Sequence, residues 1–424
     1  MIEIQPVAGP VDATVRLPGS KSLTNRALVC AAMARGKSEL HGALASDDTR
    51  VMLESLAELG IEVHVQHGGA TLEVHGCGGV VPNPSAQLAV GNSGTTIRFL
   101  TAALSMAGGT YRLDGVPRMR QRPIGPLIEA LEKLGVQIVA ESPGGCPPVS
   151  IQSSQVVLRH TEIAGDVSSQ YLSGLMMGAP LAADGLQITI TRESVSWPYV
   201  EMTRQVMQSF GVAVELSGRR SASIAADQEY SGQVYQIEPD ASAASYFWAV
   251  AAICGGTVLV EGLGRDSLQG DVRFVESLGE MGCQIDFQQR GIAVSGPAKR
   301  GIVVDMSDIS DTAQTLAMVA LFVQGSTCIT GIAHNRVKET DRVGNLAIEL
   351  RKLGAEVEER NDGLLIHPPS QLQPATIETY DDHRMAMSFA LAGLRQAGVQ
   401  ILNPRCVEKT FPDYFSRLAE AVRE

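Results

Sequence analysis

The chain repeats one pattern five times: the end of a helix, a glycine, and then an alternating strand. The spacing between successive glycines is 71 to 76 residues. A glycine directly after a helix adopts the positive φ that ends it, and alternation is typical of a half-buried strand. The regular spacing therefore predicts repeated α/β units. The five segments are LAELGIEV, LEKLGVQI, MQSFGVAV, LGEMGCQI and LRKLGAEV, with Gly60, Gly135, Gly211, Gly282 and Gly354.

A sixth unit is incomplete at the end of the chain. Its helix, DYFSRLAEAVRE, ends at Glu424, where the next glycine and strands are due. At the other end, IEIQPV and ATVRLPGS are predicted as two short strands that no helix precedes. We expect residues 1–19 to complete the last unit. The sequence then predicts one domain from 1–19 with 239–424 and a second from 20–238.

Each unit also contains a second helix that is apolar on nearly all faces. Such helices belong in an interior, whereas the amphipathic helices before the glycines cover an outside. The prediction is a two-domain inside-out α/β barrel, with three repeats per domain and buried parallel helices surrounded by sheets and outer helices. A single six-repeat solenoid is the alternative, but a solenoid caps its ends with polar units. The apolar segments are SLTNRALVCAAMA, SGTTIRFLTAALSMA, SSQYLSGLMMGAPLAA, ASAASYFWAVAAICG, SDTAQTLAMVALFVQG and DDHRMAMSFALAGLRQAG.

Charge and composition exclude several functional classes. The net charge of -12 argues against a general nucleic-acid surface. The start, MIEIQPVAGP, lacks a basic and an apolar targeting region, and no apolar run is long enough for a membrane span, so we expect a cytoplasmic protein. The seven cysteines have no metal-ligand spacing, and no dinucleotide fingerprint is present. We expect reduced thiols, no metal and no cofactor.

Cations stand where the buried helices begin. Small polar residues there are expected to cap the first turn. Lys21, Arg26, Arg98 and Arg384 are different, because the helix dipole disfavours cations in that position. Helix N-termini attract anions, so several of them combined with Lys and Arg predict a site for more than one anion. GSKS lacks the first glycine of a nucleotide-binding P-loop, which leaves anion binding without a nucleotide signature.

Four further runs carry charges at loop-to-helix junctions. Taken singly, such runs are more often solvated basic loops, ion-paired helix starts or capping histidines. Together, in an acidic chain, they indicate a site for anionic substrates. The runs are GVPRMRQRPIG (115–125), RVKETDR (336–342), DDHRMAM (381–387) and EKTFPDYF (408–415).

In order and over the whole chain, the motifs GSKSLTNRAL, GNSGTTIR, PRMRQRPIG, DVSSQY, SWPY, SDTAQT, RVKETDR, DDHRMAM and EKTFPDY resemble the EPSP synthase (3-phosphoshikimate 1-carboxyvinyltransferase) family. The resemblance implies transfer of the enolpyruvyl group of phosphoenolpyruvate to the 5-hydroxyl of shikimate 3-phosphate, through a tetrahedral intermediate that loses phosphate. It implies a monomer that glyphosate inhibits. It also implies an active site in a cleft between a phosphoenolpyruvate-side domain (1–19 with 239–424) and a shikimate 3-phosphate-side domain (20–238).

The resemblance assigns residues to both substrates. Asp311 is expected as the base toward the 5-hydroxyl and Glu339 as the acid at the methylene, assisted by Lys21 and His383. The shikimate 3-phosphate residues are Lys21, Ser22, Arg26, Ser168, Ser169, Gln170, Ser196, Asp311, His334 and Lys338, with Tyr199 nearby. The phosphoenolpyruvate residues are Lys21, Asn92, Gly94, Thr95, Arg122, Gln170, Arg342, Arg384 and Lys409.

One position departs from the family pattern, because His334 stands where many relatives have asparagine, with Asn335 next to it. Two other functions are alternatives to the activity that the resemblance implies. The sibling family, UDP-N-acetylglucosamine enolpyruvyl transferase, carries a cysteine in the loop that aligns with 115–125, and this loop has none. A non-catalytic anion-binding repeat protein explains the cations but does not need Asp311 and Glu339.

Overall fold

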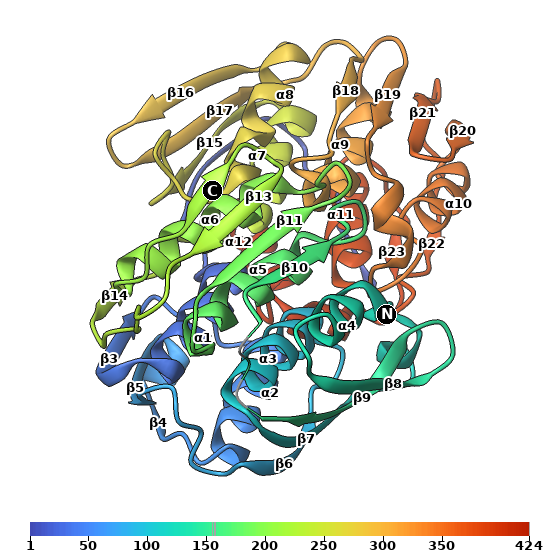
Figure 1. Ribbon diagram of the computed structural model, residues 1–424. Coiled ribbons are helices and arrows are strands. Elements are labelled where there is room, and N and C mark those ends of the chain that lie inside the picture. The colour runs from blue at the N-terminus through green and yellow to red at the C-terminus, as the bar shows by residue number, and fades with distance from the viewer. Residues whose placement is uncertain (155, 157, 424) are drawn as a thin grey trace. The chain divides into compact units, whose positions relative to one another are not determined.

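The computed structural model describes residues 1–154, 156 and 158–423. The chain divides into two compact units (Figure 1). Unit 1 contains Met1–Pro18 and Glu238–Glu424, and unit 2 contains Gly19–Ile237. Each unit contains three repeats, and each repeat contributes an inner helix, an outer helix and a sheet.

Unit 2 contains three four-stranded sheets of the same design. In each, the first two strands are parallel and the next two are antiparallel to their neighbours. The first sheet is β14 (Val234–Gln236), β3 (Arg35–His41), β5 (Thr71–Cys77) and β4 (Val63–Gln66); the second is β6 (Ser85–Ala89), β7 (Gly109–Asp114), β9 (Cys146–Ser153) and β8 (Gln137–Ser142); the third is β10 (His160–Ile163), β11 (Leu186–Ile190), β13 (Ser221–Ile224) and β12 (Glu215–Ser217).

The helices of unit 2 are of two kinds, as the sequence predicts. The inner helices are buried along almost their whole length, and the outer helices are buried on one side only. In Figure 1 the inner helices lie between the sheets of their unit. The inner helices are α1 (Lys21–Met33), α3 (Gly94–Ala107) and α5 (Ser169–Gly178), and the outer helices are α2 (Asp47–Glu58), α4 (Gly125–Glu132) and α6 (Trp197–Ser209).

Unit 1 repeats this design with one shorter sheet. Its sheets are β2 (Val11–Val15), β15 (Gly256–Glu261), β17 (Gly291–Gly296) and β16 (Gln284–Gln288); β18 (Val303–Asp305), β19 (Thr327–Thr330), β21 (Gly363–His367) and β20 (Glu356–Arg360); and β22 (Thr376–Ile377), β23 (Gln400–Ile401) and β1 (Ile2–Glu3). Its inner helices are α7 (Ala241–Cys254), α9 (Ala313–Val319) and α11 (His383–Gly393), and its outer helices are α8 (Phe274–Glu280), α10 (Gly344–Lys352) and α12 (Tyr414–Ala421).

The two N-terminal strands join different repeats, which corrects the expectation that both complete the last one. Strand β1 pairs antiparallel with β23 and so completes the sixth sheet. Strand β2 instead pairs parallel with β15 and supplies the first strand of the fourth repeat. In unit 2, β14 closes the first sheet in the same way, because it follows the third repeat and pairs with β3.

The repeated glycines end the outer helices as predicted. All five have positive φ, from 78° at Gly60 to 104° at Gly282. At the end of α2, the N–H of Gly60 donates to Ala57 and the N–H of Ile61 donates to Leu56, which is a Schellman cap. The same pair of bonds recurs at the other four glycines. The glycine therefore stops the helix and turns the chain into the next strand.

Short 3₁₀ helices connect several elements and carry some of the predicted site residues. They are η1 (His67–Gly69), η2 (Met119–Gln121), η3 (Ala179–Leu181), η4 (Gly270–Arg273), η5 (Ser310–Thr312), η6 (Ala320–Phe322), η7 (Ala333–Val337) and η8 (Pro404–Lys409). Within residues 1–154, 156 and 158–423, none of the helices combines the length and apolar character needed to cross a bilayer.

Candidate active site

In unit 2 the three inner helices contact one another within two turns of their N-termini. Asn25 of α1 donates to the hydroxyl of Thr95 of α3 at 2.6 Å. One turn further along α3, Arg98 donates to the side-chain oxygen of Gln170 of α5, also at 2.6 Å. None of the three first turns contains an acidic residue. Their positively polarised ends therefore converge on one region of unit 2, as anion binding requires.

Lys21 is the first residue of α1, directly after its N-cap, Ser20. Its Nζ lies 3.5 Å from Oδ2 of Asp48, in the first turn of α2. The lysine side chain is 13% exposed and the aspartate side chain 5%. Asp48 thus fixes a mostly buried ammonium at the start of the helix, and Ser22 follows it half-buried.

Arg26 lies in the interior of unit 2, with only 1% of its surface exposed. Its Nε donates to Thr203 at 2.7 Å and its Nη1 to the carbonyl of Ser22 at 2.9 Å. Its Nη2 donates to the hydroxyl of Ser173 and to the carbonyl of Tyr199. Burial lowers the pKa of Arg26 to about 10, which leaves it charged at neutral pH. It holds α1, α5 and α6 together.

Gly94 is the first residue of α3 and faces two guanidinium groups. A Cβ at this position would lie 2.7 Å from terminal nitrogens of both Arg98 and Arg122. Arg122 in turn donates to the carbonyl of Asn92 at 2.9 Å and to its side-chain oxygen at 3.2 Å. Asn92, Gly94, Thr95 and Arg122 therefore form one cluster, and the missing side chain of Gly94 allows the two arginines to approach.

The remaining predicted residues of unit 2 lie at the starts of α5 and α6. Ser168 is the N-cap of α5 and accepts from the N–H of Gln170, while Ser169 is buried in the first turn. Ser196 is buried at the N-cap of α6 with φ +53°. Tyr199, in the first turn of α6, has its ring centroid 5.8 Å from the Arg26 guanidinium.

Unit 1 is organised around Arg342, which is 2% exposed and binds three carboxylates. Its Nε and Nη2 donate to the two oxygens of Asp382 at 2.7 and 3.1 Å. Nη2 also lies 2.8 Å from Glu339, and Nη1 lies 3.3 Å from Asp311. Burial lowers the pKa of Arg342, but the three carboxylates together raise it above its usual value.

Asp311, in η5, is shared between two arginines. Its Oδ1 accepts from Arg342, and its Oδ2 accepts from Nη2 of Arg384 at 2.6 Å. Arg384 stands in the first turn of α11, and its Nη1 also lies 3.4 Å from the hydroxyl of Tyr246. The Asp311 side chain is 18% exposed, so it combines fixed cationic partners with partial access to solvent.

Glu339 lies between two cations. Arg342 contacts its Oε2, and Nζ of Lys409, at the end of η8, lies 3.8 Å from its Oε1. Glu339 and Lys409 are each 7% exposed. Lys338, the preceding residue, is half-buried. The structure thus brings Glu339 and Arg342 of the segment 336–342 together with Lys409 of the segment 408–415.

His334 is a neutral hydrogen-bonding group. It is buried in η7, where its Nε2 bonds the hydroxyl of Ser310 at 2.8 Å. Burial, followed by the nearby charge of Lys338, lowers the pKa of His334 to about 3. Asn335 binds the same residue, donating to the Ser310 carbonyl at 2.9 Å. The two neighbours therefore anchor η7 to η5, directly before Asp311.

His383 is the first residue of α11 and is fully buried. Its Nδ1 lies 3.5 Å from Oδ1 of Asp382, the N-cap of the helix. Asp382 also accepts from the backbone N–H of Arg384 at 2.9 Å. One carboxylate thus caps α11, contacts His383 and binds Arg342.

Sequence reasoning missed the carboxylates that hold the predicted cations. Asp382 and Asp48 were not among the predicted site residues, although Asp382 lies within the motif DDHRMAM. An Asp at a helix N-cap before an arginine, as in DDHR, is the signal that could have found Asp382. Asp48 had no such signal, because α2 reaches Lys21 only through the packing of α1 on α2.

Each unit therefore presents a distinct chemical environment. Unit 2 offers convergent helix N-termini with lysine, arginine, hydroxyl and amide groups, which suits phosphate and carboxylate oxygens. Unit 1 offers arginines and a lysine interleaved with carboxylates, which suits anion binding combined with proton transfer.

The chain is similar to known proteins over its whole length. A family model described as EPSP synthase (3-phosphoshikimate 1-carboxyvinyltransferase) matches residues 6–418. The chain is 47% identical to a 3-phosphoshikimate 1-carboxyvinyltransferase of Herminiimonas arsenicoxydans, with 100% of this chain and 98% of that protein covered. It is 44% identical to the chloroplastic protein of the same name from Brassica napus, covering 98% and 84%. The structure of EPSP synthase from Acinetobacter baumannii matches with a TM-score of 0.82 at 26% identity, covering 99% and 97%.

Proposed function

This chain belongs to the EPSP synthase family, and we propose on that basis that it transfers the enolpyruvyl group of phosphoenolpyruvate to the 5-hydroxyl of shikimate 3-phosphate. It is a transferase of the shikimate pathway, which supplies chorismate for aromatic amino acid synthesis. Both substrates are anions, which accounts for cations at the starts of buried helices in an acidic chain.

The single observation that carries the chemical assignment is that Asp311 and Glu339 share one arginine. Arg342 lies 3.3 Å from Asp311 and 2.8 Å from Glu339. The reaction needs a proton added to the enol methylene and one removed from the 5-hydroxyl. Two carboxylates on opposite nitrogens of one guanidinium are placed to divide that work.

We assign the proton transfers within unit 1. Asp311 accepts the proton of the 5-hydroxyl as that oxygen bonds to the central carbon of phosphoenolpyruvate. Glu339 donates a proton to the methylene, which becomes a methyl group in the tetrahedral intermediate. The intermediate then loses phosphate, and the methyl group returns one proton to restore the double bond. Lys21 and His383 assist by balancing charge.

The residues proposed for substrate binding come from both units. Shikimate 3-phosphate is assigned to Lys21, Ser22, Arg26, Ser168, Ser169, Gln170 and Ser196 of unit 2 with Asp311, His334 and Lys338 of unit 1. Phosphoenolpyruvate is assigned to Lys21, Asn92, Gly94, Thr95, Arg122 and Gln170 of unit 2 with Arg342, Arg384 and Lys409 of unit 1. Arginine suits these roles, since its fork binds phosphate and carboxylate bidentately.

We further propose that the protein acts in the cytoplasm, that it is a monomer and that glyphosate inhibits it. The sibling activity on UDP-N-acetylglucosamine is not favoured, because loop 115–125 contains no cysteine.

A phosphate-release assay with phosphoenolpyruvate and either acceptor tests the proposal. We expect release with shikimate 3-phosphate and none with UDP-N-acetylglucosamine. Release with the nucleotide sugar would assign the chain to the sibling activity, and release with neither acceptor would favour an anion-binding protein without catalysis. Exhaustive chelation should leave the activity intact.

A further inference from the structure

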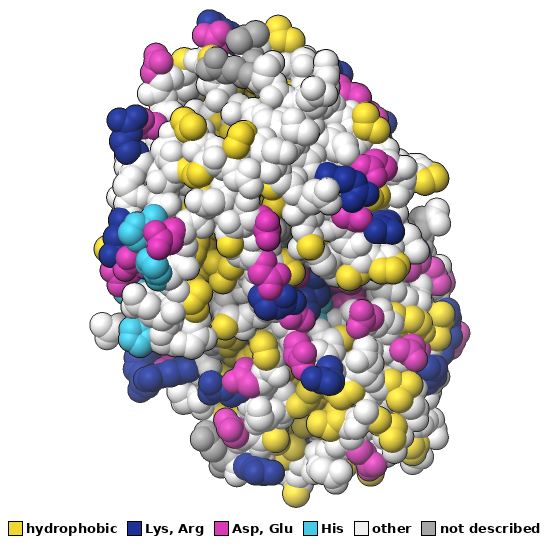
Figure 2. Space-filling view, turned by 90° about the horizontal axis from the view of Figure 1, so that it is seen from below, with side chains coloured by type: hydrophobic (Ala, Val, Ile, Leu, Met, Phe, Trp, Pro, Cys, Tyr) yellow, Lys and Arg dark blue, Asp and Glu magenta, His cyan; other side chains and the backbone are white. Residues whose placement is uncertain are grey.

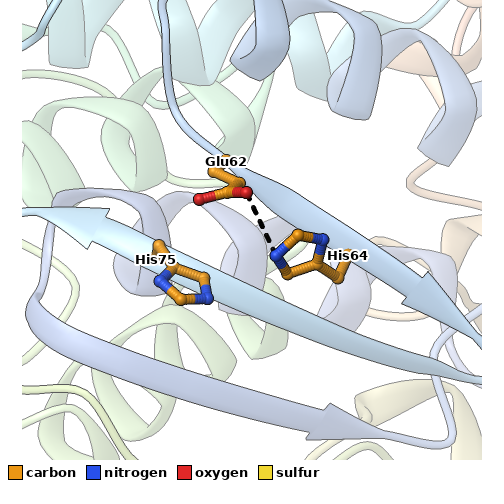
Figure 3. Close-up of side chains that lie close together, drawn as sticks. All are labelled: Glu62, His64 and His75. Atoms are coloured by element: carbon orange, nitrogen blue, oxygen red, sulfur yellow. Dashed lines mark ion pairs between the residues drawn. The ribbon is translucent and has the colours of Figure 1, made fainter.

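A group of potential metal ligands lies on the first sheet of unit 2, on residues that the proposed function does not use. It consists of Glu62, His64 and His75, and one ligand atom from each lies within 4.8 Å of the others. Figure 3 shows the three side chains close together above two neighbouring strands, with an ion pair between Glu62 and His64. Figure 2 shows histidine side chains gathered with acidic and basic ones on the face it displays.

Strand pairing brings the group together. Strands β4 and β5 are antiparallel, and the N–H of His75 donates to the carbonyl of Glu62, so these two residues stand opposite each other. His64 stands opposite Glu73 in the next register position of the same pair. Alternate residues of a strand share a face, so Glu62, His64, Glu73 and His75 all project from one side of the sheet.

The distances are close to those that a single ion requires. Nε2 of His64 lies 3.1 Å from Oε1 of Glu62, and the two imidazole rings have centroids 5.4 Å apart and nearly perpendicular planes. Ligands of a tetrahedral zinc ion, bound at about 2.0–2.1 Å, are separated by about 3.3 Å. Exposed side chains on a strand reach that separation by rotamer adjustment.

A neighbouring carboxylate is placed to orient one ligand. Oε1 of Glu73 lies 3.0 Å from Nε2 of His75. Metal-binding histidines commonly donate their second ring nitrogen to such a carboxylate, which fixes the tautomer and the ring.

The charge of this face favours a cation. Besides Glu62 and Glu73 it carries Glu39, which pairs with His41 at 3.2 Å. Its two cations on β3 are each held by a glutamate, Lys37 by Glu73 at 2.7 Å and Arg35 by Glu229 at 2.8 Å. With Glu229 included, the carboxylates outnumber the lysine and the arginine.

We propose that Glu62, His64 and His75 bind one divalent transition metal ion of the Zn²⁺ class, with Glu73 as a positioning residue. Two imidazoles and a carboxylate suit this class better than Mg²⁺ or Ca²⁺, which prefer oxygen ligands alone. Three protein ligands leave a position for water. The ion would connect β4, the edge strand of the sheet, to β5. The site is separate from the transferase chemistry.

Isothermal titration of the full chain with Zn²⁺ at pH 7.5 tests the proposal. We expect one saturable site per chain that is lost in both His64→Gln and His75→Gln. Glu73→Gln should weaken it by about 10–100-fold, as changes in orienting partners do. The matched control is His160→Gln, because His160 is an exposed strand histidine of the same unit that bonds Thr189 instead. That variant should bind as the unaltered chain does.

Electron paramagnetic resonance with Cu²⁺ supplies a direct structural readout. Coupling to two imidazole nitrogens is expected in the unaltered chain, and this signal should be lost in each single histidine variant. Phosphate release should be unchanged in all of them. Absence of a saturable site, or binding that persists equally in His64→Gln and His75→Gln, would overturn the proposal, since the three residues would then form surface ion pairs only.

Discussion

The two units hold their arginines with different groups. In unit 2 the hydrogen bonds described for Arg26, Arg98 and Arg122 go to hydroxyl, amide and carbonyl oxygens. In unit 1, Arg342 and Arg384 are held by carboxylates. The two kinds of partner suit different tasks. Neutral oxygens position a cation for binding, whereas carboxylates among cations also provide proton donors and acceptors.

The largest effect is expected when a carboxylate of unit 1 is neutralised, because these carboxylates are proposed to transfer protons. Asp311→Asn keeps the shape of the side chain but removes the base, and general base catalysis contributes about 10²–10⁴-fold to rate. We expect kcat for phosphate release to fall within that range. The control is Asp305→Asn, an exposed aspartate that bonds only the local N–H of Ser307 among the contacts described. A kcat for Asp311→Asn equal to that of the control would remove Asp311 from the chemistry.

A second prediction concerns stability, and compares two adjacent aspartates. Asp382 is fully buried and binds Arg342 through both oxygens. Asp382→Asn therefore removes a negative charge that balances the buried charge of Arg342. Breaking such a pair costs about 3–5 kcal/mol of unfolding free energy. Asp381 is exposed and bonds Asn403 at 3.0 Å, and Asp381→Asn should cost less than about 0.5 kcal/mol. Urea denaturation of both variants measures the contrast, which equal losses would contradict.

A third prediction concerns the arginine cluster of unit 2. A methyl group in Gly94→Ala would meet the guanidinium ends of Arg98 and Arg122, and relieving such a clash costs about 1–3 kcal/mol. Glyphosate has one more atom between its phosphorus and its carboxylate than phosphoenolpyruvate, so it should lose more affinity. We expect its inhibition constant to rise about 5–150-fold.

The matched control for that variant is Gly125→Ala. Gly125 also begins a helix, α4, but a Cβ there meets its nearest described neighbour at an ordinary 3.7 Å. Inhibition by glyphosate should be unchanged in this variant. If Gly94→Ala also leaves inhibition unchanged, the cluster around Arg122 is not where the inhibitor binds.

The fourth prediction uses the pH dependence of unit 1. His334 has a pKa of about 3 in the folded protein, below the ordinary value of about 6.5 in the unfolded chain. Between these values the unfolded chain binds a proton that the native state does not, so stability falls as pH decreases from 6.5 toward 3. At pH 5 the loss is about 2 kcal/mol. Denaturation at pH 5 and pH 7.5 should show a smaller difference for His334→Gln, whereas exposed His160→Gln should behave as the unaltered chain does.

Local sequence signals predicted much of the fold. The sequence predicts that the five glycines end helices, and each has the positive φ and the Schellman bonds of that position. The continuous apolar segments predict inner helices, and α3 and α7 are buried along nearly their whole length. Both features depend on the residue itself and its neighbours, so the sequence contains them directly.

The pairing of strands and of charged side chains that are distant in the sequence could not be predicted in the same way. Strands β1 and β2 both precede the first helix, yet β1 pairs with β23 and β2 pairs with β15. Within the site, Lys21 and Arg342 were predicted, but not that Asp48 and Asp382 would bind them. Strand pairing and ion pairing across a core depend on how whole elements approach, which no short motif records.

We propose that both proton-transferring carboxylates lie in unit 1, whereas Asp48, the buried carboxylate beside Lys21 in unit 2, serves anion binding only. Single-turnover phosphate release at saturating substrates tests it in two matched variants, Glu339→Gln and Asp48→Asn, because each neutralises a buried carboxylate beside a lysine predicted to bind substrate. We predict a rate about 10²–10⁴-fold lower for Glu339→Gln. For Asp48→Asn we predict a nearly unchanged rate, with a shifted substrate concentration for half-saturation. An unchanged rate in Glu339→Gln, or an equal loss in both variants, would contradict the account.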